Sequence, residues 1–479
     1  MAILRLDRLG PGAAALLRAL GAPPGAALVG GVIRDVVLRR TEADPSRDID
    51  VAVPSGALEL ARRCAERLRG TCVVLDAERG AARVIADGGL TLDLTDFRGP
   101  SLEADLAARD FTVDALAVPL GTLVTRGRAP IVDPTGGLAD LAARRLRPAG
   151  PGVLDDDPLR ALRAVRLEAT LGLRLTAPAA RAVRRAAPGL ERVSPERVRD
   201  ELLILLALPD TARALRRADA LGLLAVVVPE IEAMRVTAQP APHRFDVLEH
   251  SLRAVAGCDR LLARLDALAP YGEELAAHVA EPLGGGARRA AALKLAALLH
   301  DVSKPETRQR IAGRVRFFEH DVIGARRVRA LGERLRLPER VIAVVERLVR
   351  HHLRPMHLGH AAAITPRARY RFYRDLREDT RDLLLLVLAD AAAVTGASPL
   401  ATWRRAGVVR ELFAGWREQR EAETRPALLR GEDVMARFSL EPGPRVGWLL
   451  AQAREAQDLG RVRSREEALA YLDSLDPGP

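Results

Sequence analysis

Predicted strands are confined to the first part of the chain, and this asymmetry constrains the fold more than any other feature. Short runs rich in apolar and β-branched residues occur at residues 26–29, 49–53, 72–75, 82–86 and 90–96. From about Asp155 onward, helical runs interrupted by proline and glycine dominate. The sequence therefore predicts an α+β fold: an N-terminal head with a mixed sheet and helices, followed by an all-helical body.

The length of 479 residues is sufficient for two to four domains. The triplet Gly284-Gly285-Gly286 is predicted to be a loop between helices. No apolar run reaches the roughly 18 residues that a membrane span needs, so no membrane association is expected. The three cysteines show neither metal-type nor disulfide spacing, and the N-terminus lacks signal-peptide order; both favour the cytoplasm. We expect a head at 1–145, a helical region at 146–235, a second helical domain at 236–400 and a helical tail at 401–479.

Asp48 and Asp50 are the first candidate metal ligands. They open the apolar strand at residues 49–53, and side chains at positions i and i+2 of a strand point to the same face. Two such carboxylates can share a hard cation such as Mg²⁺. Taken alone, a D-x-D pattern is weak evidence for a metal site, and an exposed strand edge is the better interpretation.

A glycine-rich turn precedes the two aspartates. Gly30 and Gly31 follow the predicted strand at 26–29, and Arg34 lies one helical turn further on. Glycine allows backbone amides to approach phosphate groups closely, and arginine binds phosphate oxygens. The combined pattern, G-G-x-x-R-D and then D-x-D 13 residues later, is much more specific than either part and indicates a site for a nucleoside triphosphate.

These motifs resemble the class II tRNA nucleotidyltransferase and bacterial poly(A) polymerase family, within the polymerase β-like superfamily. The resemblance covers about residues 25–205 and includes three further motifs in family order. Residues 109–116 resemble R-D-F-T-x-N-A-L, although Ala108 replaces a preceding arginine and Asp114 replaces the asparagine. The other two motifs are D-P-x-G-G at residues 133–137 and the helical motif at residues 194–202.

The resemblance implies Mg²⁺-dependent transfer of CMP, and of AMP, from CTP and ATP to the 3′ end of tRNA. All nine histidines lie after residue 242, so metal-assisted deprotonation is expected in the head rather than an imidazole base. Asp48 and Asp50 are the expected catalytic, Mg²⁺-binding residues. Because three carboxylates are usual in the wider superfamily, Asp93 on a later predicted strand is a candidate third carboxylate. Gly31, Arg34 and Arg109 are expected to contact the phosphates or the ribose, and Gly30 and Asp110 are also expected to bind the nucleotide.

A helical row is expected to select the base. Asp157, Arg160, Arg163 and Arg166 recur every three residues and share one broad helix face. Residues 156–160 resemble the family's E-D-x-x-R, with Asp in place of Glu at position 156, and the family's equivalents of Asp157 and Arg160 read the base. Cytosine and adenine each present an amine donor beside a ring-nitrogen acceptor, which suits a carboxylate beside an arginine. Without the head motifs, a salt-bridged surface helix would be the better interpretation.

The connection after Phe97-Arg98 is short. Only Gly99-Pro100 separates it from the predicted helix that starts near Ser101. Many CCA-adding relatives carry a longer flexible loop at this point, which is thought to help them switch between CTP and ATP. The short connection favours a CC-adding enzyme, but short-loop relatives of other specificity exist, so full CCA addition stays open.

The distribution of charge suggests a polyanionic partner. The net charge is +11, and residues 144–200 contain 13 arginines against 7 acidic residues. We expect this region and the helical body to follow a tRNA through its phosphates, so that recognition depends on RNA shape more than on sequence. The strong preference for arginine over lysine weakens any argument from arginine abundance alone.

The histidines form a second motif set. The order H…HD…H…HH…D over residues 243–392 resembles the HD phosphohydrolase superfamily. Imidazole and carboxylate ligands suit a divalent transition metal and a metal-bound water for phosphoester cleavage. The expected ligands are His250, His300, Asp301 and Asp390, with His320 and His351 as candidates for a second metal.

Three other interpretations stay open from the sequence. A poly(A) polymerase, or an enzyme that adds only part of CCA, would use the same head. A metal-dependent HD phosphohydrolase could carry a vestigial head, but the retained D-x-D and G-G-x-x-R motifs argue against this. A non-catalytic RNA-binding protein is disfavoured by the two intact sets of metal-ligand candidates. The sequence leaves the oligomeric state open.

Overall fold

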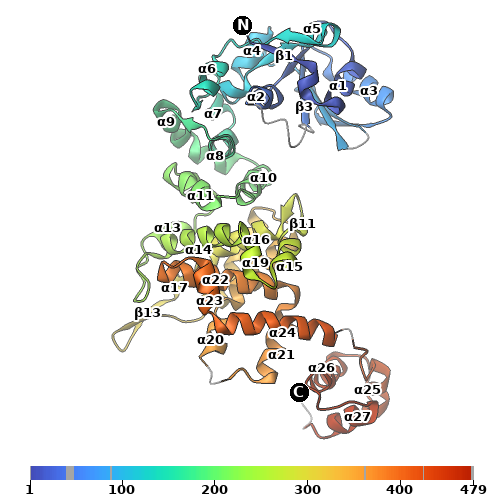
Figure 1. The fold of residues 1–479 in the computed structure, drawn as a ribbon, viewed down its shortest axis with the longest axis vertical. Coiled ribbons are helices and arrows are strands. Elements are labelled where there is room, and N and C mark those ends of the chain that lie inside the picture. Colours follow the sequence, from blue (N-terminus) through green and yellow to red (C-terminus); the bar gives the residue numbers. More distant parts are fainter. Residues whose placement is uncertain (1, 39–47, 87–88, 361–362, 424, 476–479) are drawn as a thin grey trace. The chain divides into compact units, whose positions relative to one another are not determined.

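The computed structural model describes residues 2–38, 48–86, 89–360, 363–423 and 425–475 (Figure 1). The chain forms two compact units. Unit 1 consists of Met1–Glu201 and Arg217–Val227, and unit 2 consists of Leu202–Arg216 and Val228–Pro479. The chain therefore enters unit 2, returns once to unit 1, and then enters unit 2 again. The four predicted domains are finer than these two units, and their boundaries stay predictions.

Unit 1 contains a six-stranded sheet in the order β4-β5-β6-β3-β2-β7. Within it, β3 and β6 are parallel and the other neighbours are antiparallel, so the sheet is mixed, as predicted. All five predicted strands are present. The bounds are β2 Ala27–Val29, β3 Asp48–Val53, β4 Thr71–Asp76, β5 Ala81–Ile85, β6 Thr91–Asp96 and β7 Ala117–Pro119.

Burial explains this strand order. Strands β2 and β3 lie in the centre of the sheet, and the described side chains of residues 27–29 and 51–53 are buried. Strand β6 alternates buried and partly exposed residues, as expected where one face packs on helices. The helix α3 (Ala57–Leu68) contacts β4, β5 and β6, and buries Ala57, Ala61, Cys64 and Ala65. The central strands are therefore held rigidly, which positions any side chain at their ends.

The remaining elements of unit 1 are mostly helical. Helix α8 follows Pro158, whose restricted φ suits the start of a helix, as predicted. Helix α12 packs against the short helix at Ala187–Arg192. The bounds are α1 Pro11–Leu20, α2 Gly31–Val37, α4 Leu102–Ala107, α5 Leu120–Arg126, α6 Gly137–Ala142, α7 Val153–Asp156, α8 Leu159–Leu171, α9 Ala177–Ala186 and α12 Leu223–Val227, with β1 Ile3–Arg5, β8 Arg128–Pro130, β9 Arg145–Leu146 and β10 Arg174–Leu175; α10 Pro195–Leu206 and α11 Thr211–Ala220 each include the end of a segment of unit 1.

Unit 2 is built around helices α14, α16, α19 and α22. Helix α22 carries a buried run of leucines from Leu383 to Leu386 and packs on α14. A separate apolar cluster holds α25, α26 and α27 together. The bounds are α13 Ile231–Arg235, α14 Val247–Leu262, α15 Gly272–Val279, α16 Arg289–Leu299, α17 Lys304–Thr307, α18 His320–Arg334, α19 Glu339–His351, α20 Arg354–Gly359, α21 Pro366–Leu376, α22 Thr380–Thr395, α23 Pro399–Arg405, α24 Gly407–Glu423, α25 Gly431–Phe438, α26 Pro444–Asp458 and α27 Arg465–Asp473.

No single helix in the described ranges is both long and apolar enough to cross a bilayer. One bent pair, Pro366–Thr395 with Pro399–Arg405, meets the same criteria of length and composition.

The helical body also contains two hairpins that the sequence analysis did not predict. Strands β11 (Pro282–Gly284) and β12 (Ala287–Arg288) flank the glycine triplet that was expected to join two helices. Strands β13 (Arg308–Ile311) and β14 (Arg314–Phe317) form the second hairpin. Its two turn residues, Ala312 and Gly313, have φ of 47° and 78°. Two consecutive positive φ values are typical of the tight turns that match the twist of paired strands.

Candidate functional site

A cavity of about 1260 Å³ lies in unit 1 and is lined by eight arginines. Side chains from β3, β6, α2 and α8 reach it, and so do residues of the segment after α4. Asp48 begins β3, but its side chain lies outside the described part of the structure. The cavity brings together all the other predicted residues of the nucleotide site: Gly30, Gly31, Arg34, Asp50, Arg109, Asp110, Asp157, Arg160, Arg163 and Arg166.

Two carboxylates face each other across parallel strands in this cavity. Asp50 on β3 is in direct register with Asp93 on β6. Adjacent strands lie about 4.8 Å apart and paired residues point to the same face, so both can approach one cation. Arg83 on β5 binds Asp93 through two hydrogen bonds, Nε to Oδ1 at 2.7 Å and Nη2 to Oδ2 at 2.8 Å. The candidate third carboxylate therefore has an arginine partner.

Two glycines make room for these groups. Gly30 has φ of 81° and ψ of −149°, a conformation that is essentially restricted to glycine. A Cβ at Gly30 would lie 2.9 Å from Oδ2 of Asp50, and a Cβ at Gly31 would lie 3.2 Å from Nη2 of Arg34. The G-G pair is therefore required by the close approach of a carboxylate and a guanidinium to the turn.

Arg34 lies between two carboxylates. Its Nε donates to Oδ1 of Asp35 at 2.9 Å, and its Nη1 donates to Asp114. Asp114, which replaces the family's asparagine, was not predicted as a site residue. Burial and the nearby charge of Asp110 outweigh the attraction of Arg34 and raise the pKa of Asp114 to about 6. The substitution therefore places a titratable group beside the arginine expected to bind phosphate.

This raised pKa predicts a pH-dependent stability of unit 1. When unfolded, Asp114 ionises near its ordinary value of 3.8, but in the fold it ionises near 6. Its contribution to stability is therefore fully present below the unfolded pKa and is lost as the pH rises through 6. We expect the free energy of unfolding of the wild type, relative to Asp114→Asn, to fall by roughly 2–3 kcal/mol between pH 4 and pH 7.5. Urea unfolding of both proteins across this range measures the difference, and a pH-independent difference would contradict the prediction.

Asp157 and Arg160 are held by separate partners. Nη1 of Arg160 lies within hydrogen-bonding distance of the backbone oxygens of Ala108, Arg109 and Val153, at 3.2, 3.4 and 3.1 Å. Oδ2 of Asp157 accepts from Nη2 of Arg197 at 2.7 Å and lies 4.0 Å from Nε of Arg160. Burial opposes ionisation of Asp157, but Arg197 and Arg160 outweigh it and lower its pKa. Asp157 is therefore an ionised acceptor in the cavity at neutral pH.

Arg163 and Arg166 have carboxylate partners that the sequence analysis did not assign. Both bind buried Glu201, through Nε at 3.3 and 2.8 Å respectively. Arg163 also donates to Oδ2 of Asp110 at 3.0 Å. The charges of these two arginines are thus largely offset, and their geometry indicates that they fix α8 and Asp110 more than they read a base. Glu201 and Arg197 both lie in the recognised motif at residues 194–202, which was the available signal for them.

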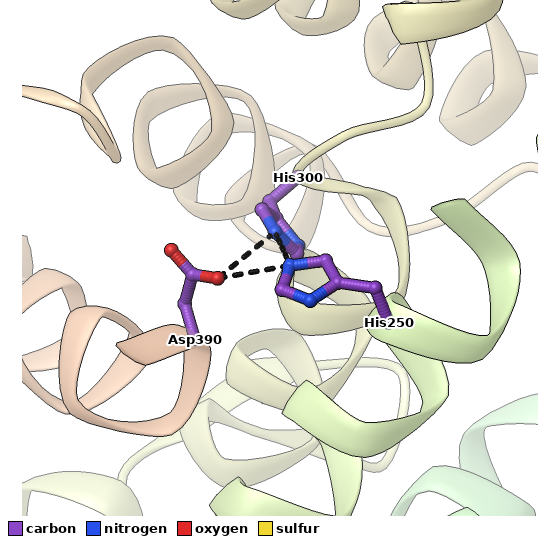
Figure 2. Close-up of side chains that lie close together, drawn as sticks. All are labelled: His250, His300 and Asp390. Carbon is purple, nitrogen blue, oxygen red and sulfur yellow. Dashed lines mark hydrogen bonds and ion pairs between the residues drawn. The ribbon is translucent and has the colours of Figure 1, made fainter. Parts of the chain in front are cut away.

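A second candidate site lies in unit 2, where His250, His300 and Asp390 meet (Figure 2). Oδ1 of Asp390 lies 2.9 Å from Nε2 of His250 and 3.6 Å from Nε2 of His300. The two Nε2 atoms are 3.3 Å apart. These residues come from α14, the end of α16 and α22, so three core helices bring the ligand atoms together.

Asp301 begins a second group beside the first. Its Oδ1 lies 3.4 Å from Nε2 of His320 and 3.7 Å from Nε2 of His352, and its Oδ2 lies 3.2 Å from Nε2 of His300. Asp301 therefore lies between the two groups. The predicted second ligand beside His320 is His351, but the structure places its neighbour His352 there.

The difference between these adjacent histidines follows from helix geometry. One residue along a helix turns the side chain by about 100°, so only one of the pair can face the cluster. Burial and the charge of Arg354 lower the pKa of His351 to about 4. His351 is only partly buried, whereas His352 is fully buried beside His320.

The tautomers of three histidines are set by the backbone. Nδ1 of His300, His320 and His352 lies 2.9, 2.6 and 2.7 Å from the carbonyl oxygen three residues earlier in the chain. In a neutral ring, an Nδ1–H that donates to a carbonyl leaves Nε2 with a lone pair directed into the cluster, which is the usual arrangement in metal-ligating histidines. Nε2 of His320 and Nε2 of His352 are 3.3 Å apart. Two facing lone pairs at this distance favour a shared cation.

The carboxylates around these histidines also favour a bound cation. Burial alone would lower the pKa of His300, but Asp301 and Asp390 outweigh it and raise the pKa to about 10. Burial lowers the pKa of His352 to about 3. Lys304 donates from Nζ to Oδ2 of Asp301 at 2.6 Å. The cluster thus combines imidazoles with carboxylates that attract positive charge, and a divalent transition metal would replace the proton that His300 carries.

Comparison with known proteins decides the family. The family described as "Poly A polymerase head domain" matches residues 26–147, "Probable RNA and SrmB- binding site of polymerase A" matches 172–235, and "HD domain" matches 247–394. The chain is 38% identical over 459 residues to the A-adding tRNA nucleotidyltransferase of Deinococcus radiodurans, covering 94% of this chain and 95% of that protein. The chain belongs to the tRNA nucleotidyltransferase family. It is therefore a nucleotidyltransferase enzyme, and the predicted resemblance is confirmed.

Further relatives of this tRNA nucleotidyltransferase differ in their named specificity. The CC-adding tRNA nucleotidyltransferase of Thermus thermophilus is 35% identical over 457 residues, covering 94% of this chain and 93% of that protein. Among solved structures, a CCA-adding enzyme in complex with ATP has a TM-score of 0.64 at 20% identity, covering 99% of this chain and 100% of that chain. The Thermotoga maritima CCA-adding enzyme complexed with tRNA has a TM-score of 0.60 at 20% identity, covering 99% of each chain. These structures confirm the fold, and membership of the family implies divalent-metal-dependent catalysis.

Proposed function

We propose that this enzyme completes the 3′ end of tRNA by transferring CMP and AMP from CTP and ATP, with release of pyrophosphate. The observation that carries the proposal is the single cavity that joins the D-x-D strand, the G-G turn and the Asp157/Arg160 pair. Relatives and structural neighbours are named for tRNA, CTP and ATP. The three cysteines are free thiols, which suits a cytoplasmic enzyme.

Asp48 and Asp50 would hold Mg²⁺ at the end of the sheet. Their oxygen donors on one strand face are the ligands that this cation prefers. When bound, the ion neutralises charge on the triphosphate and activates the attacking 3′-hydroxyl. Arg34 and Arg109 would orient the triphosphate, and Gly30 leaves the space in which Asp50 and the phosphates meet.

The choice of base would be made by Asp157 and Arg160. Asp157 accepts a hydrogen bond from an exocyclic amine, and Arg160 donates one to the adjacent ring nitrogen. Uracil and guanine present the opposite order, which would leave a buried acceptor and donor unpaired. Because backbone carbonyls hold Arg160 and Arg197 holds Asp157, the pair is arranged before the nucleotide enters.

Two observations bear on how many nucleotides are added. Only residues 97–101 connect β6 to α4, and this short connection favours CC addition. The relative from Thermus thermophilus is named CC-adding, whereas the relative from Deinococcus radiodurans is named A-adding. We therefore keep addition of CMP as the first expectation and addition of a terminal AMP as the second.

Transcripts of one tRNA ending before CCA and after CC test this function. Each is incubated with CTP, ATP or both, and the products are resolved at single-nucleotide resolution. Addition of two CMP residues to the first transcript marks a CC-adding enzyme. Addition of one AMP to the second transcript, with no extension of the first, marks an A-adding enzyme. Completion with both nucleotides marks CCA addition, and long tails from ATP mark a poly(A) polymerase. Failure to extend either transcript would contradict the proposal.

A second function, metal-dependent phosphoester hydrolysis on nucleotide or RNA ends, is favoured by the two groups that meet at Asp301. His250, His300 and Asp390 would hold one transition-metal ion, and Asp301, His320 and His352 a second. When bound, such ions polarise the phosphoester and activate water. The positions of the Nε2 atoms, set by backbone carbonyls, support this proposal.

Replacing His300 with alanine is expected to weaken binding of Mn²⁺ or Ni²⁺ at least tenfold, because a ligand of the first group is lost. Hydrolysis of bis-p-nitrophenyl phosphate should fall to background, while nucleotide transfer in unit 1 is retained. Isothermal titration with each metal and the chromogenic assay measure these effects. His357→Ala is the matched control, since His357 is exposed and belongs to neither group. Equal metal binding by wild type and His300→Ala would contradict the second function.

A further inference from the structure

The hairpin β13–β14 belongs to unit 2 (Figure 1). It is strongly basic, and neither proposed activity uses it. Residues 308–317 contain Arg308, Arg310, Arg314 and Arg316 and no acidic residue. All four arginines are exposed. The two strands pair only with each other, so both outer edges of this small sheet are open.

The register of the hairpin distributes its charge over both faces. Arg314 is paired with Ile311, and Arg316 with Gln309, so these four residues share one face. That face is exposed along its whole length. Arg308 and Arg310 lie on the opposite face, where Phe317 and Val315 are partly buried. One face therefore packs partly against the protein, and the other offers arginines to solvent.

These arginines lack acidic partners, unlike many in the chain. Within the described ranges, none of the four hairpin arginines has a carboxylate within 4.0 Å. On α18, by contrast, Arg327 binds Glu306 with Nε 2.5 Å from Oε1, and Arg329 binds Glu346 at 2.8 Å. An uncompensated group of guanidinium ions costs self-repulsion, which a polyanionic ligand would relieve.

The base of the hairpin is attached to the second metal-binding group. Nδ1 of His320 lies 2.6 Å from the carbonyl oxygen of Phe317, the last residue of β14. Nζ of Lys304, which binds Asp301, lies 5.6 Å from the centre of the Phe317 ring. The next residue in the chain, Phe318, is 57% exposed. A ligand on the hairpin is therefore one residue from an exposed aromatic ring and three from a candidate metal ligand.

We propose that the hairpin β13–β14 binds the backbone of a single RNA strand and presents it to the two metal-binding groups, so that this centre acts on RNA rather than on free nucleotides. The proposal rests on the second proposed function. Hydrolysis would break one P–O bond of the RNA, with water supplying hydroxide to phosphorus and a proton to the leaving oxygen. Phe318 would stack on a base next to the reacting phosphate.

The length of the hairpin favours a polymer over a mononucleotide. Four residues of strand extend over about 10 Å, so one phosphate can reach only one or two of the arginines. Successive phosphates of a chain can engage them together, and arginine binds phosphate through two parallel N–H groups. A duplex is less suitable, because its stacked bases could not reach the ring of Phe318.

The test compares two double variants of the full chain with equal loss of charge. Arg314→Gln/Arg316→Gln alters the hairpin, and Arg404→Gln/Arg405→Gln removes two exposed arginines from α23. Each metal-loaded protein is assayed with a 12-nucleotide RNA carrying a 3′-phosphate and with bis-p-nitrophenyl phosphate. We expect the hairpin variant to lose about tenfold in kcat/KM on RNA and its log–log salt slope to decrease by about 1.4. Activity on the small substrate should stay within twofold of wild type.

In this kinetic comparison, either of two results would overturn the proposal: unchanged kcat/KM on RNA in the hairpin variant, or an equal loss in the α23 variant. An acidic protein partner would then be the better explanation of the hairpin. If wild type hydrolyses neither substrate, the phosphohydrolase function fails, and crosslinking still tests the hairpin. RNA containing 4-thiouridine should then crosslink within residues 308–318 in wild type and about tenfold less in Arg314→Gln/Arg316→Gln; no crosslink in this segment would overturn RNA binding.

Discussion

Replacing Asp50 with asparagine is expected to lower kcat/KM for nucleotide transfer by about 10³-fold or more, which corresponds to about 4 kcal/mol of transition-state stabilisation. The amide keeps the size of the side chain but removes the charge that holds a hard cation. Asp50 lies opposite Asp93 and close to the turn at Gly30, so another group cannot easily take the place of its carboxylate. Single-turnover extension of a tRNA transcript at saturating Mg²⁺ measures the effect.

Asp76→Asn is the matched control for this variant. Asp76 lines the same cavity from β4, at the edge of the sheet and away from the pair formed by β3 and β6. Asp76→Asn should retain activity within about threefold of wild type. The thermal unfolding midpoints of Asp50→Asn and Asp76→Asn should both equal that of the wild type. If Asp50→Asn kept more than a tenth of wild-type activity, the carboxylate would not be the metal ligand that we propose.

The second large effect is expected on base selection. Replacing Asp157 with alanine should reduce the preference for CTP over UTP, as a ratio of kcat/KM values, by about 10²-fold, because discrimination depends on a hydrogen bond that the wrong base cannot make. Arg160→Ala should have a similar effect on selectivity. It should also weaken binding of all nucleotides, since Arg160 contacts the backbone at Ala108 and Val153 and helps to shape the cavity.

The control for selectivity lies two residues earlier. Asp155 is exposed, lies 3.9 Å from Arg185 and does not line the nucleotide cavity. Asp155→Ala should therefore leave the CTP-to-UTP ratio within twofold of wild type. Competition assays with equimolar nucleotides give the ratio directly. Loss of activity without loss of selectivity in Asp157→Ala would show that Asp157 supports the fold of α8 rather than reading the base.

The strands and the residues of the nucleotide cavity could be predicted because their signals are local. Apolar runs between turns mark β2 to β6, and residue spacing places Arg160, Arg163 and Arg166 on one helix face. Partners from distant segments could not be predicted in the same way. Arg197 binds Asp157 from 40 residues away, and Glu201 binds Arg166 from 35 residues away. Such pairs depend on how helices pack, which sequence spacing does not report.

Two errors have a different physical origin. His351 and His352 are adjacent, and the rotation of α19 about its axis decides which of the two side chains faces the cluster. Only the apolar pattern of α19 could have indicated this rotation. Hairpin β13–β14 carries arginines where a half-buried strand would carry apolar residues, so it shows no strand pattern within the region predicted to be helical. The Ala312-Gly313 turn was the remaining signal, and it is a weak one without the positive φ values that the structure shows.

The exchange of short segments between the two units has a consequence for synthesis and truncation. Arg217 binds Glu168 with Nε 2.6 Å from Oε2, and Leu223 and Leu224 complete the apolar core of unit 1. The intervening segment, Leu202–Arg216, belongs to unit 2. There the amide of Ala212 donates to Asp259, and Nζ of Lys294 donates to the hydroxyl of Thr211 at 3.0 Å. A ribosome must therefore release residue 227 before unit 1 can close its core. No single cut in the chain yields two intact halves, because a fragment ending at residue 201 lacks α12 and a fragment starting at residue 228 lacks Thr211 and Ala212, which bind Lys294 and Asp259.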